Sequence, residues 1–321
     1  MIGNLGKETI ITIGVSACLL GEKVRYDGGH KGDRYITDTL GRYCQLVPVC
    51  PEVELGMGAP REAVRLEGMP DAPRMVGIES GTDWTTRMNR FSRKHVSQFK
   101  PLLLAGYILK EGSPSCGLKR VPVFRGRGKS WRNGRGLYAA ALLERYPLLP
   151  VEEESRLCDI RVRENFIVRI FACSRLQQLL RHFSLNRLIR FHTAHKYLLQ
   201  AHSPGHYKIL EQLVSGAKSY RPATLRQQYS SIFMEALRYK TTISKNIRVL
   251  RAILRELRSY LSAAEKEDIS RVIEDYRRQL VPLVVPIALL RHRVNIHKID
   301  GLCDQVYLDP PPAELMLRNY A

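Results

Sequence analysis

The chain has 321 residues and a net charge of +20, a length that favours two domains and a charge that favours a polyanionic partner. Its 44% apolar content suffices for real cores, whereas seven cysteines are too few for a disulfide scaffold at this length. No stretch is long and apolar enough to cross a membrane, and an odd number of cysteines without secretory context indicates reduced thiols in the cytoplasm.

Three apolar runs in the first half of the chain each lead to a cysteine. Residues 10–17 predict a buried strand before Cys18, residues 46–49 a second before Cys50, and residues 102–109 a third that leads to Cys116. Further segments alternate with these runs: short strands at 63–66, 75–78 and 148–151, and helices at 36–43, 83–100 and 137–146. The alternation predicts an α/β domain with a mainly parallel, Rossmann-like sheet and a site at the carboxyl ends of its strands.

The loop after Cys18 has the composition of a site rather than of a simple connector. Residues 19–30 combine glycines with Arg25, Tyr26 and Asp27. For Asp27 we favour a structural role in this loop over contact with a substrate. Val15-Ser-Ala-Cys18 also resembles the cleavage site of a bacterial lipoprotein, but the preceding run is short and contains Gly14, so we expect no lipid anchor.

An Arg/Gly-rich segment, residues 124–136, follows the third cysteine and is predicted to be a mobile loop. Its cations and the aromatic ring of Trp131 suit phosphates and an unstacked base. The candidate contact residues are Arg125, Arg127, Lys129, Trp131, Arg132 and Arg135.

From about Cys158 the pattern becomes purely helical. Apolar residues recur at helical intervals in five segments: 156–182, 184–201, 224–240, 244–261 and 263–280. Ser262 with Glu265, and Thr224 with Gln227, have the spacing of capping boxes.

We predict an α/β domain at 1–155, a helical connector at 156–182 and an all-helical domain at 183–321. The helical half is the more basic, since residues 156–321 hold 28 Lys and Arg against 14 Asp and Glu, whereas residues 1–155 hold 23 against 17.

The three strand-end cysteines are candidate ligands of one metal centre. A single buried cysteine is most often a small core residue, and spacings of 32 and 66 residues match no zinc ribbon or ferredoxin motif. Their shared position at strand ends is the stronger signal, and three thiolates without an obvious fourth leave one coordination position open for catalysis. The other cysteines are expected to be structural: Cys44, Cys158, Cys173 and Cys303.

The motifs around these cysteines resemble the bacterial thiouracil desulfidase family, long classed as a domain of unknown function. They are Ser16-Ala-Cys18-Leu-Leu-Gly21, Arg25-Tyr-Asp-Gly-Gly29, Pro48-Val-Cys50-Pro-Glu52 and Ser113-Pro-Ser-Cys-Gly117. Residues 184–310 resemble a helical domain, also formerly of unknown function, that is often fused behind it. The segments that carry this second resemblance include Arg190–Ser203, Val281–Pro286 and Gln305–Leu308. The fused arrangement resembles transfer-RNA 4-thiouridine desulfidases, which implies tRNA as the partner.

The resemblance implies a 4Fe-4S cluster on Cys18, Cys50 and Cys116 with one open iron, and places the family's catalytic acid on Glu52. Its catalytic serine falls on Ser113, with Ser115 as the second candidate. Two positions depart from the family. Many relatives carry a further cysteine where this chain has Val24, and relatives are richer in proline around Arg61.

Residues of the helical half are candidates for RNA contact. His192, His195 and Lys196 are the ones we single out, although core packing is an alternative for the two histidines, and no cysteine or carboxylate joins them at metal-ligand spacing. Two rival functions stay open at this point. The protein could desulfurate free thiouracils, with the helical domain serving assembly, or it could be a non-enzymatic RNA-binding or redox-sensing protein with zinc or no metal.

Overall fold

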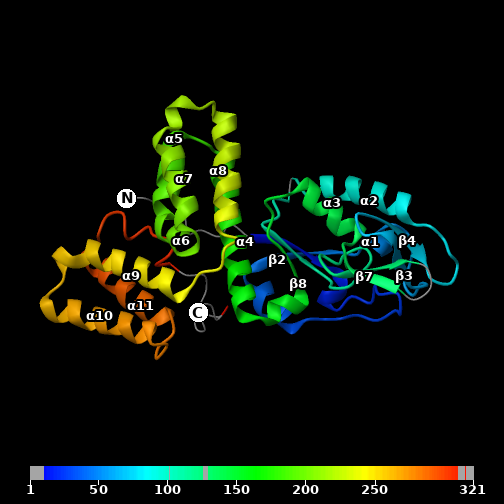
Figure 1. Cartoon of the computed structure of the whole chain (residues 1–321), viewed down its shortest axis with the longest axis horizontal. Coiled ribbons are helices and arrows are strands. Elements are labelled where there is room, and N and C mark those ends of the chain that lie inside the picture. The colour runs from blue at the N-terminus through cyan, green and yellow to red at the C-terminus, as the bar shows by residue number, and fades with distance from the viewer. Residues whose placement is uncertain (1–10, 101, 126–128, 310–314, 316–321) are drawn as a thin grey trace. The chain divides into compact units, whose positions relative to one another are not determined.

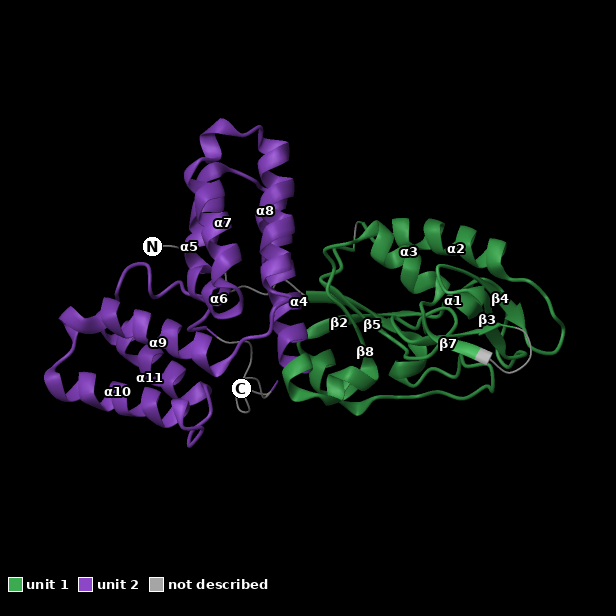
Figure 2. Ribbon diagram, in the orientation of Figure 1, with its two compact units in different colours: residues 1–162 green, residues 163–321 purple. Residues whose placement is uncertain are grey.

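A computed structural model of the chain describes residues 11–100, 102–125, 129–309 and 315 (Figure 1). An α/β region comes first, and from residue 160 onward the regular elements are all helices. The predicted fold class is confirmed. The chain divides into two compact units, residues 1–162 and residues 163–321 (Figure 2).

Four strands of the first unit form a parallel sheet in the order β2-β1-β5-β8. Their bounds are Ile11–Ser16 (β1), Cys44–Val49 (β2), Gly106–Leu109 (β5) and Val151–Glu153 (β8). Every residue of β1 and β5 is buried. Strands covered on both faces are apolar throughout instead of alternating, which is why the sequence shows them as continuous apolar runs.

A second, mixed sheet has the order β4-β3-β6-β7. It comprises Val64–Met69 (β3), Ala72–Gly77 (β4), Val121–Arg125 (β6) and Lys129–Gly134 (β7). The prediction of a mobile loop over residues 124–136 is wrong, because most of it belongs to the antiparallel β6–β7 pair. Val121 and Val123 are almost fully buried and anchor this pair in the core, a signal that the many Arg and Gly residues obscure in the sequence.

Two helices, α2 (Thr85–Ser97) and α3 (Leu137–Arg145), supply apolar side chains to the core of each sheet.

Tyr107 of β5 is fully buried in the core beside the parallel sheet. Its ring lies so close to Gly14 that a Cβ there would be 2.3 Å from Tyr107 Cε2. Gly14 therefore permits a close approach that any other residue would prevent.

The helical unit consists of α4 (Ile160–Arg181), α5 (Leu185–Ala194), α6 (Lys196–His202), α7 (Pro204–Ser215), α8 (Pro222–Ala236), α9 (Ile243–Leu257), α10 (Ala263–Arg277) and α11 (Val284–His297). The capping box of Ser262 and Glu265 is confirmed at the start of α10. The capping box predicted for Thr224 and Gln227 is wrong, because α8 already begins at Pro222. Helix α7 was not predicted, although Pro204 at its first position is a typical start. In the described part of the chain, no helix has the length and apolarity needed to cross a membrane.

Candidate functional site

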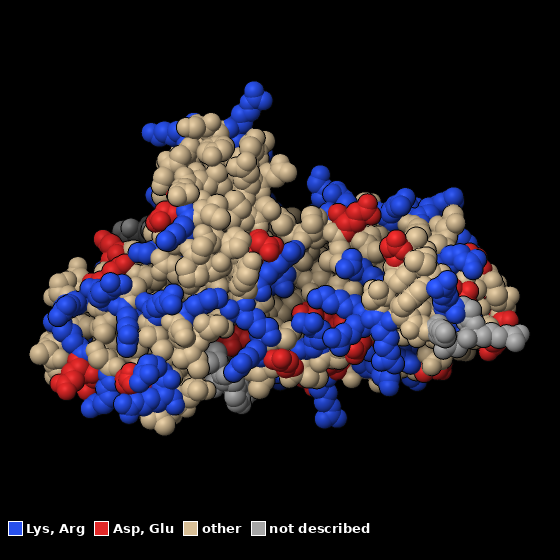
Figure 3. Space-filling view, in the orientation of Figure 1, with Lys and Arg blue, Asp and Glu red and all other residues tan. Residues whose placement is uncertain are grey.

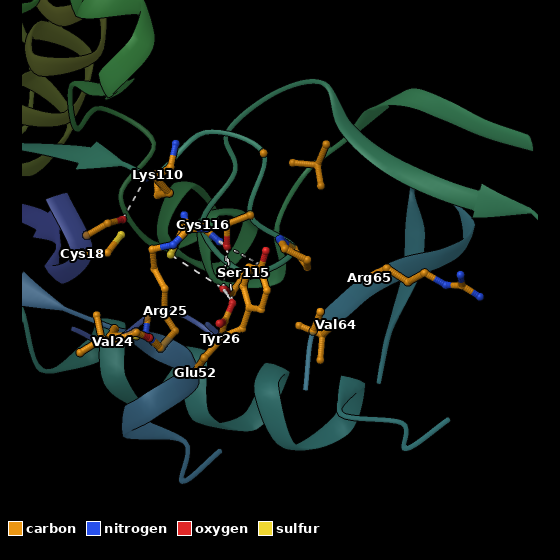
Figure 4. A pocket seen from close by; sticks show the side chains of 18 of the residues that line it. Cys18, Val24, Arg25, Tyr26, Glu52, Val64, Arg65, Lys110, Ser115 and Cys116 are labelled. Carbon is orange, nitrogen blue, oxygen red and sulfur yellow. Dashed lines mark hydrogen bonds between the residues drawn. The ribbon is translucent and has the colours of Figure 1, made fainter. Parts of the chain in front are cut away.

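The carboxyl ends of three parallel strands bring the predicted site together. Ser16 of β1 pairs with Val49 of β2, and Val15 pairs with Ile108 of β5, so the three strands end at the same edge. The loops that follow carry the three cysteines, and all three line one cavity of about 400 Å³. The same cavity is lined by Glu52, Ser113 and Ser115, so the structure unites the cysteine, acid and serine candidates (Figure 4).

Each cysteine is placed by a different local structure. Cys18 lies in a short 3₁₀ turn, Ala17–Leu20, directly after β1. Cys50 is the N-cap of the short helix α1 (Pro51–Glu54), and its N–H donates to Glu54 Oε1 at 2.9 Å. Cys116 lies in the loop after β5, where Gly136 packs so closely that a Cβ on it would be 2.3 Å from the Ser115 carbonyl oxygen.

Cys18 and Cys116 are buried, Cys50 is partly buried, and the three residues line the same cavity. Burial raises the pKa of Cys18 to about 11, and repulsion from a thiolate at Cys50 adds to the rise. Burial likewise raises the pKa of Cys116 well above its ordinary value, with Glu52, Cys50 and Cys18 contributing, and burial also raises the pKa of Cys50. Neutral thiols are therefore favoured until a cation binds and stabilises the thiolates.

This donor set suits an iron–sulfur group. Cysteine thiolates are the usual ligands of iron–sulfur clusters, and these three face one cavity that no fourth described cysteine lines. Among the described residues, no group of three or more His, Cys, Asp and Glu side chains lies in an arrangement that could hold a metal ion. The fit therefore rests on the kind of donor and on the shared cavity.

Glu52 is the centre of a hydrogen-bond network in the cavity wall. The Ser115 hydroxyl donates a short hydrogen bond to Glu52 Oε1, and Ser113 Oγ lies 3.5 Å from the same oxygen. The two serine hydroxyls are 3.0 Å apart. One carboxylate oxygen thus faces both hydroxyls, which gives a path along which a proton can move between Glu52 and the serines.

The two serines differ in their other contacts. Ser113 Oγ accepts the backbone N–H groups of Ser115 at 3.3 Å and Cys116 at 3.1 Å, so it shapes the loop that holds Cys116. Ser115 is 1% exposed, and its hydroxyl lies 3.9 Å from Cys116 Sγ. Ser113 is therefore both a loop-forming residue and a member of the Glu52 network, whereas Ser115 contacts the acid more closely.

Arg61 holds the other oxygen of the carboxylate. Its Nη2 forms a short ion pair with Glu52 Oε2, and its Nη1 donates to the carbonyl oxygens of Val24 at 2.9 Å and Gly58 at 2.7 Å. The Cys50 thiol also donates to the Val24 carbonyl, at 3.7 Å. The sequence marked Arg61 and Val24 only as departures from the family. Nothing in the spacing of Arg61 and Glu52 indicates that the two side chains meet.

The predicted nucleic-acid residues of the first unit do not share this cavity. Asp27 pairs with Arg25 and accepts the Gly29 N–H at 3.0 Å, so its hydrogen bonds lie within its own loop. Arg125 lies over the Trp131 ring, 5.6 Å from its centroid. Arg132 and Arg135 line a second cavity of about 660 Å³. Arg127 and the side chain of Lys129 lie outside the described residues.

The three candidates of the helical unit have partners inside that unit. His192 Nδ1 contacts the Tyr229 hydroxyl at 3.2 Å, and His195 Nδ1 contacts the Phe191 carbonyl oxygen at 2.7 Å. Both rings are buried, so core packing is the role they fill in this structure. Lys196 is partly exposed and pairs with Glu256 at 3.0 Å.

Comparison with known proteins finds a matching family model for each half of the chain. Residues 13–154 match the 2-thiouracil desulfurase family, and residues 196–312 match DUF1722, a family of unknown function. The uncharacterized protein YbgA of Escherichia coli (strain K12) is 24% identical over 161 residues, which are 50% of this chain and 95% of YbgA.

Two further relatives each match part of the chain. The uncharacterized protein YbbK of Bacillus subtilis (strain 168) is 32% identical over 108 residues, which are 32% of this chain and 71% of YbbK. A solved structure of the 4Fe-4S-dependent thiouracil desulfidase TudS is 36% identical, covers 46% of this chain and 94% of its own, and gives a TM-score of 0.38. Through residues 13–154, the chain belongs to the 2-thiouracil desulfurase family.

Proposed function

We propose that this protein is a desulfidase that replaces the sulfur of 4-thiouridine in tRNA by oxygen, in the cytoplasm, with a 4Fe-4S cluster held by Cys18, Cys50 and Cys116. The observation that carries the proposal is the single cavity in which these three thiols meet the network of Glu52, Ser113 and Ser115. Membership of the 2-thiouracil desulfurase family supports the reaction class, and the 4Fe-4S dependence of TudS supports the cofactor.

The reaction is a hydrolysis and exchanges no electrons. Water adds to the ring carbon that carries the sulfur, the carbon–sulfur bond breaks, and the products are a ring carbonyl and hydrogen sulfide. When bound, the cluster would supply a Lewis-acidic iron with affinity for sulfur. The protein must then position the thiocarbonyl in the cavity, remove a proton from the attacking water and return a proton to the departing sulfur.

We assign the removal of that proton to Glu52. Its Oε2 is held by Arg61, which leaves Oε1, the oxygen that faces the two serine hydroxyls, as the proton acceptor. A proton taken up at Oε1 can pass through the Ser115 or Ser113 hydroxyl toward the sulfur, since those two hydroxyls are within hydrogen-bond distance of each other. Tyr26 and Phe124 also line the cavity and offer aromatic faces to a pyrimidine ring.

The choice of tRNA as substrate rests on the helical half of the chain. Residues 156–321 carry 28 Lys and Arg against 14 Asp and Glu, an excess that a free base does not require. A modified base inside a folded RNA must be turned out of its stack, and this needs contacts that hold the backbone.

The test is sulfide release from thiolated tRNA by protein reconstituted without oxygen. Glu52→Gln should lower the rate about 10²- to 10⁴-fold, the usual contribution of a positioned general base. Glu79→Gln changes an exposed carboxylate that does not line the cavity and should leave the rate unchanged. Cluster-loaded wild-type protein that releases no sulfide from thiolated tRNA would show the proposal to be wrong.

Hydrolysis of free thiouracils is the second candidate, favoured by the 36% identity to a thiouracil desulfidase. Turnover of free 4-thiouracil and of thiolated tRNA, measured side by side on one preparation, decides between the two. A higher kcat/KM on the free base would assign the helical unit to assembly instead of RNA binding.

A further inference from the structure

One groove of the helical unit gathers cationic side chains around a cavity of about 890 Å³. We call it the α9 groove. It is lined by residues of α6, α7, α9 and α10, together with Arg258 just beyond the end of α9. Its cations are Lys208, Arg248, Arg251, Arg255, Arg258 and Lys266.

The arginines of α9 form a stripe along one face of that helix. Arg248, Arg251 and Arg255 follow at intervals of three and four residues, the spacing that places side chains on the same face. All three are exposed, while the opposite face of the helix buries Ile247, Leu250, Ile253 and Leu257. The stripe from Arg248 to Arg255 extends about 10 Å at 1.5 Å per residue.

The groove cations differ from the other cations of the helical unit in their partners. Basic residues elsewhere in this unit form ion pairs with carboxylates, among them Lys196, Arg238, Arg271, Arg277, Arg278, Arg291 and Arg293. Within the described residues, none of the six groove cations forms a salt bridge. The carboxylate among the lining residues, Glu211, accepts a hydrogen bond from the Tyr207 hydroxyl at 2.8 Å.

An unneutralised set of like charges at a concave surface concentrates positive potential there and attracts anions. Arginine favours phosphate because its planar guanidinium donates two parallel hydrogen bonds. In Figure 3, Lys and Arg side chains are numerous over the region of α9 and α10. None of the lining residues is among the large apolar side chains that are exposed, which argues against insertion into a lipid surface.

We propose that the α9 groove binds the phosphodiester backbone of the RNA substrate, with Arg248, Arg251 and Arg255 contacting successive phosphates and Lys208 and Lys266 contributing from α7 and α10. This inference rests on the proposed function, since it names the surface that grips the RNA while a base enters the cavity of the cysteines. Binding through this groove depends on charge and not on sequence, because none of its contacts requires a base.

The experiment measures the affinity of full-length protein for an unmodified tRNA transcript as a function of salt concentration. Each phosphate contact contributes about 0.7 to 0.9 to the slope of log K against log salt. The triple variant Arg248→Gln, Arg251→Gln, Arg255→Gln should reduce that slope by about two to three, and it should weaken binding at least tenfold near 0.1 M salt. The thermal unfolding temperature and the circular dichroism spectrum check that the variant is folded.

A matched control removes three exposed cations that do not line the groove: Lys218→Gln, Arg221→Gln, Lys240→Gln. It lowers the net charge by the same amount and should change the slope by less than one. Equal losses in the two triple variants would overturn the proposal, because only net charge would then matter. Retained RNA affinity combined with lost binding to phosphatidylserine vesicles would also overturn it and assign the groove to a membrane.

RNA binding by the groove and sulfide release from thiolated tRNA can fail independently, and the two results are distinguishable. If wild-type protein releases sulfide from thiolated tRNA and the groove variant binds RNA and turns over normally, only the groove assignment is wrong. If wild-type protein binds the transcript through the groove but releases no sulfide from thiolated tRNA, the groove assignment holds and the proposed reaction is wrong.

Discussion

Arg61 and Glu52 form an ion pair that is almost fully withdrawn from water, with side-chain exposures of 5% and 12%. The same guanidinium donates to the Val24 and Gly58 carbonyls, so it joins the acid to the loop after Cys18 and to its own loop. Arg61 Nε lacks a hydrogen-bond partner among the described residues, so the ion pair and the two carbonyl contacts position the side chain. Arg61 therefore fixes the position of the Glu52 carboxylate.

Replacing Arg61 should affect stability and rate together. Arg61→Ala leaves a buried carboxylate unpaired and should cost about 3–5 kcal/mol in the free energy of unfolding, with a large loss of sulfide release. Arg61→Lys keeps the charge but cannot reach both carbonyls and the carboxylate at once, so it should recover only part of both losses. Urea unfolding and sulfide assays measure the two effects.

Arg74→Ala provides the control for Arg61, because Arg74 is 61% exposed and its two ion pairs lie at 3.7 and 3.8 Å. It should change the free energy of unfolding by less than about 0.5 kcal/mol. If Arg61→Ala behaves like Arg74→Ala in both assays, then Arg61 does not position Glu52.

The two serines should be separable by comparing stability with rate. Ser113→Ala removes the acceptor of two backbone N–H groups and should lower the free energy of unfolding by about 1–3 kcal/mol as well as the rate. Ser115→Ala removes the short hydrogen bond to Glu52 and should lower the rate with a smaller effect on stability. Equal unfolding curves for the two variants would contradict this division of roles.

The cysteines should divide into cluster ligands and structural residues. Cys18→Ala, Cys50→Ala and Cys116→Ala should each abolish the broad brown absorbance of protein purified without oxygen. Cys44→Ala and Cys173→Ala alter buried cysteines that do not line the cavity, and the absorbance should persist in both. A colourless wild-type preparation with stoichiometric zinc would instead favour the non-enzymatic alternative.

His195 should make the helical unit sensitive to acid. Burial, together with the charges of Arg175 and His192, lowers the pKa of His195 to about 3 from an ordinary value of 6.5. The folded state keeps the ring neutral while the unfolded chain takes up a proton below pH 6.5. The neutral His195 ring therefore makes its full contribution to the free energy of unfolding above pH 6.5. This contribution falls as the pH drops toward 3, by no more than about 1.4 kcal/mol per pH unit.

The variant His195→Phe removes this titration and should flatten the loss of stability between pH 6.5 and 5. Most carboxylates have not yet titrated in that window, so they do not obscure the effect. Urea unfolding at pH 7 and pH 5 measures the difference between wild type and variant. An identical pH dependence in both would mean that the ring is not kept neutral by the fold.

The sequence alone was sufficient to predict the α/β and helical fold classes. Strands buried on both faces appear as continuous apolar runs, and helices with one buried face show apolar residues at intervals of three and four, so both patterns are local. The position of Cys18 and Cys50 at one sheet edge follows from the same reasoning, because parallel strands place their carboxyl ends together. The capping box at Ser262 is likewise a contact within four residues.

Contacts between side chains far apart in the chain could not be predicted from the sequence. The β6–β7 pair was missed because Val121 and Val123 are anchored by a core cluster that they share with the neighbouring strands of their sheet and with α2 and α3. The Arg and Gly residues that dominate the composition of the segment do not indicate this packing. The ion pair of Arg61 with Glu52 and the meeting of Lys208, Arg248 and Lys266 in one groove arise only when loops and helices pack. Only the tertiary structure determines such contacts, because no periodic pattern along the chain predicts them.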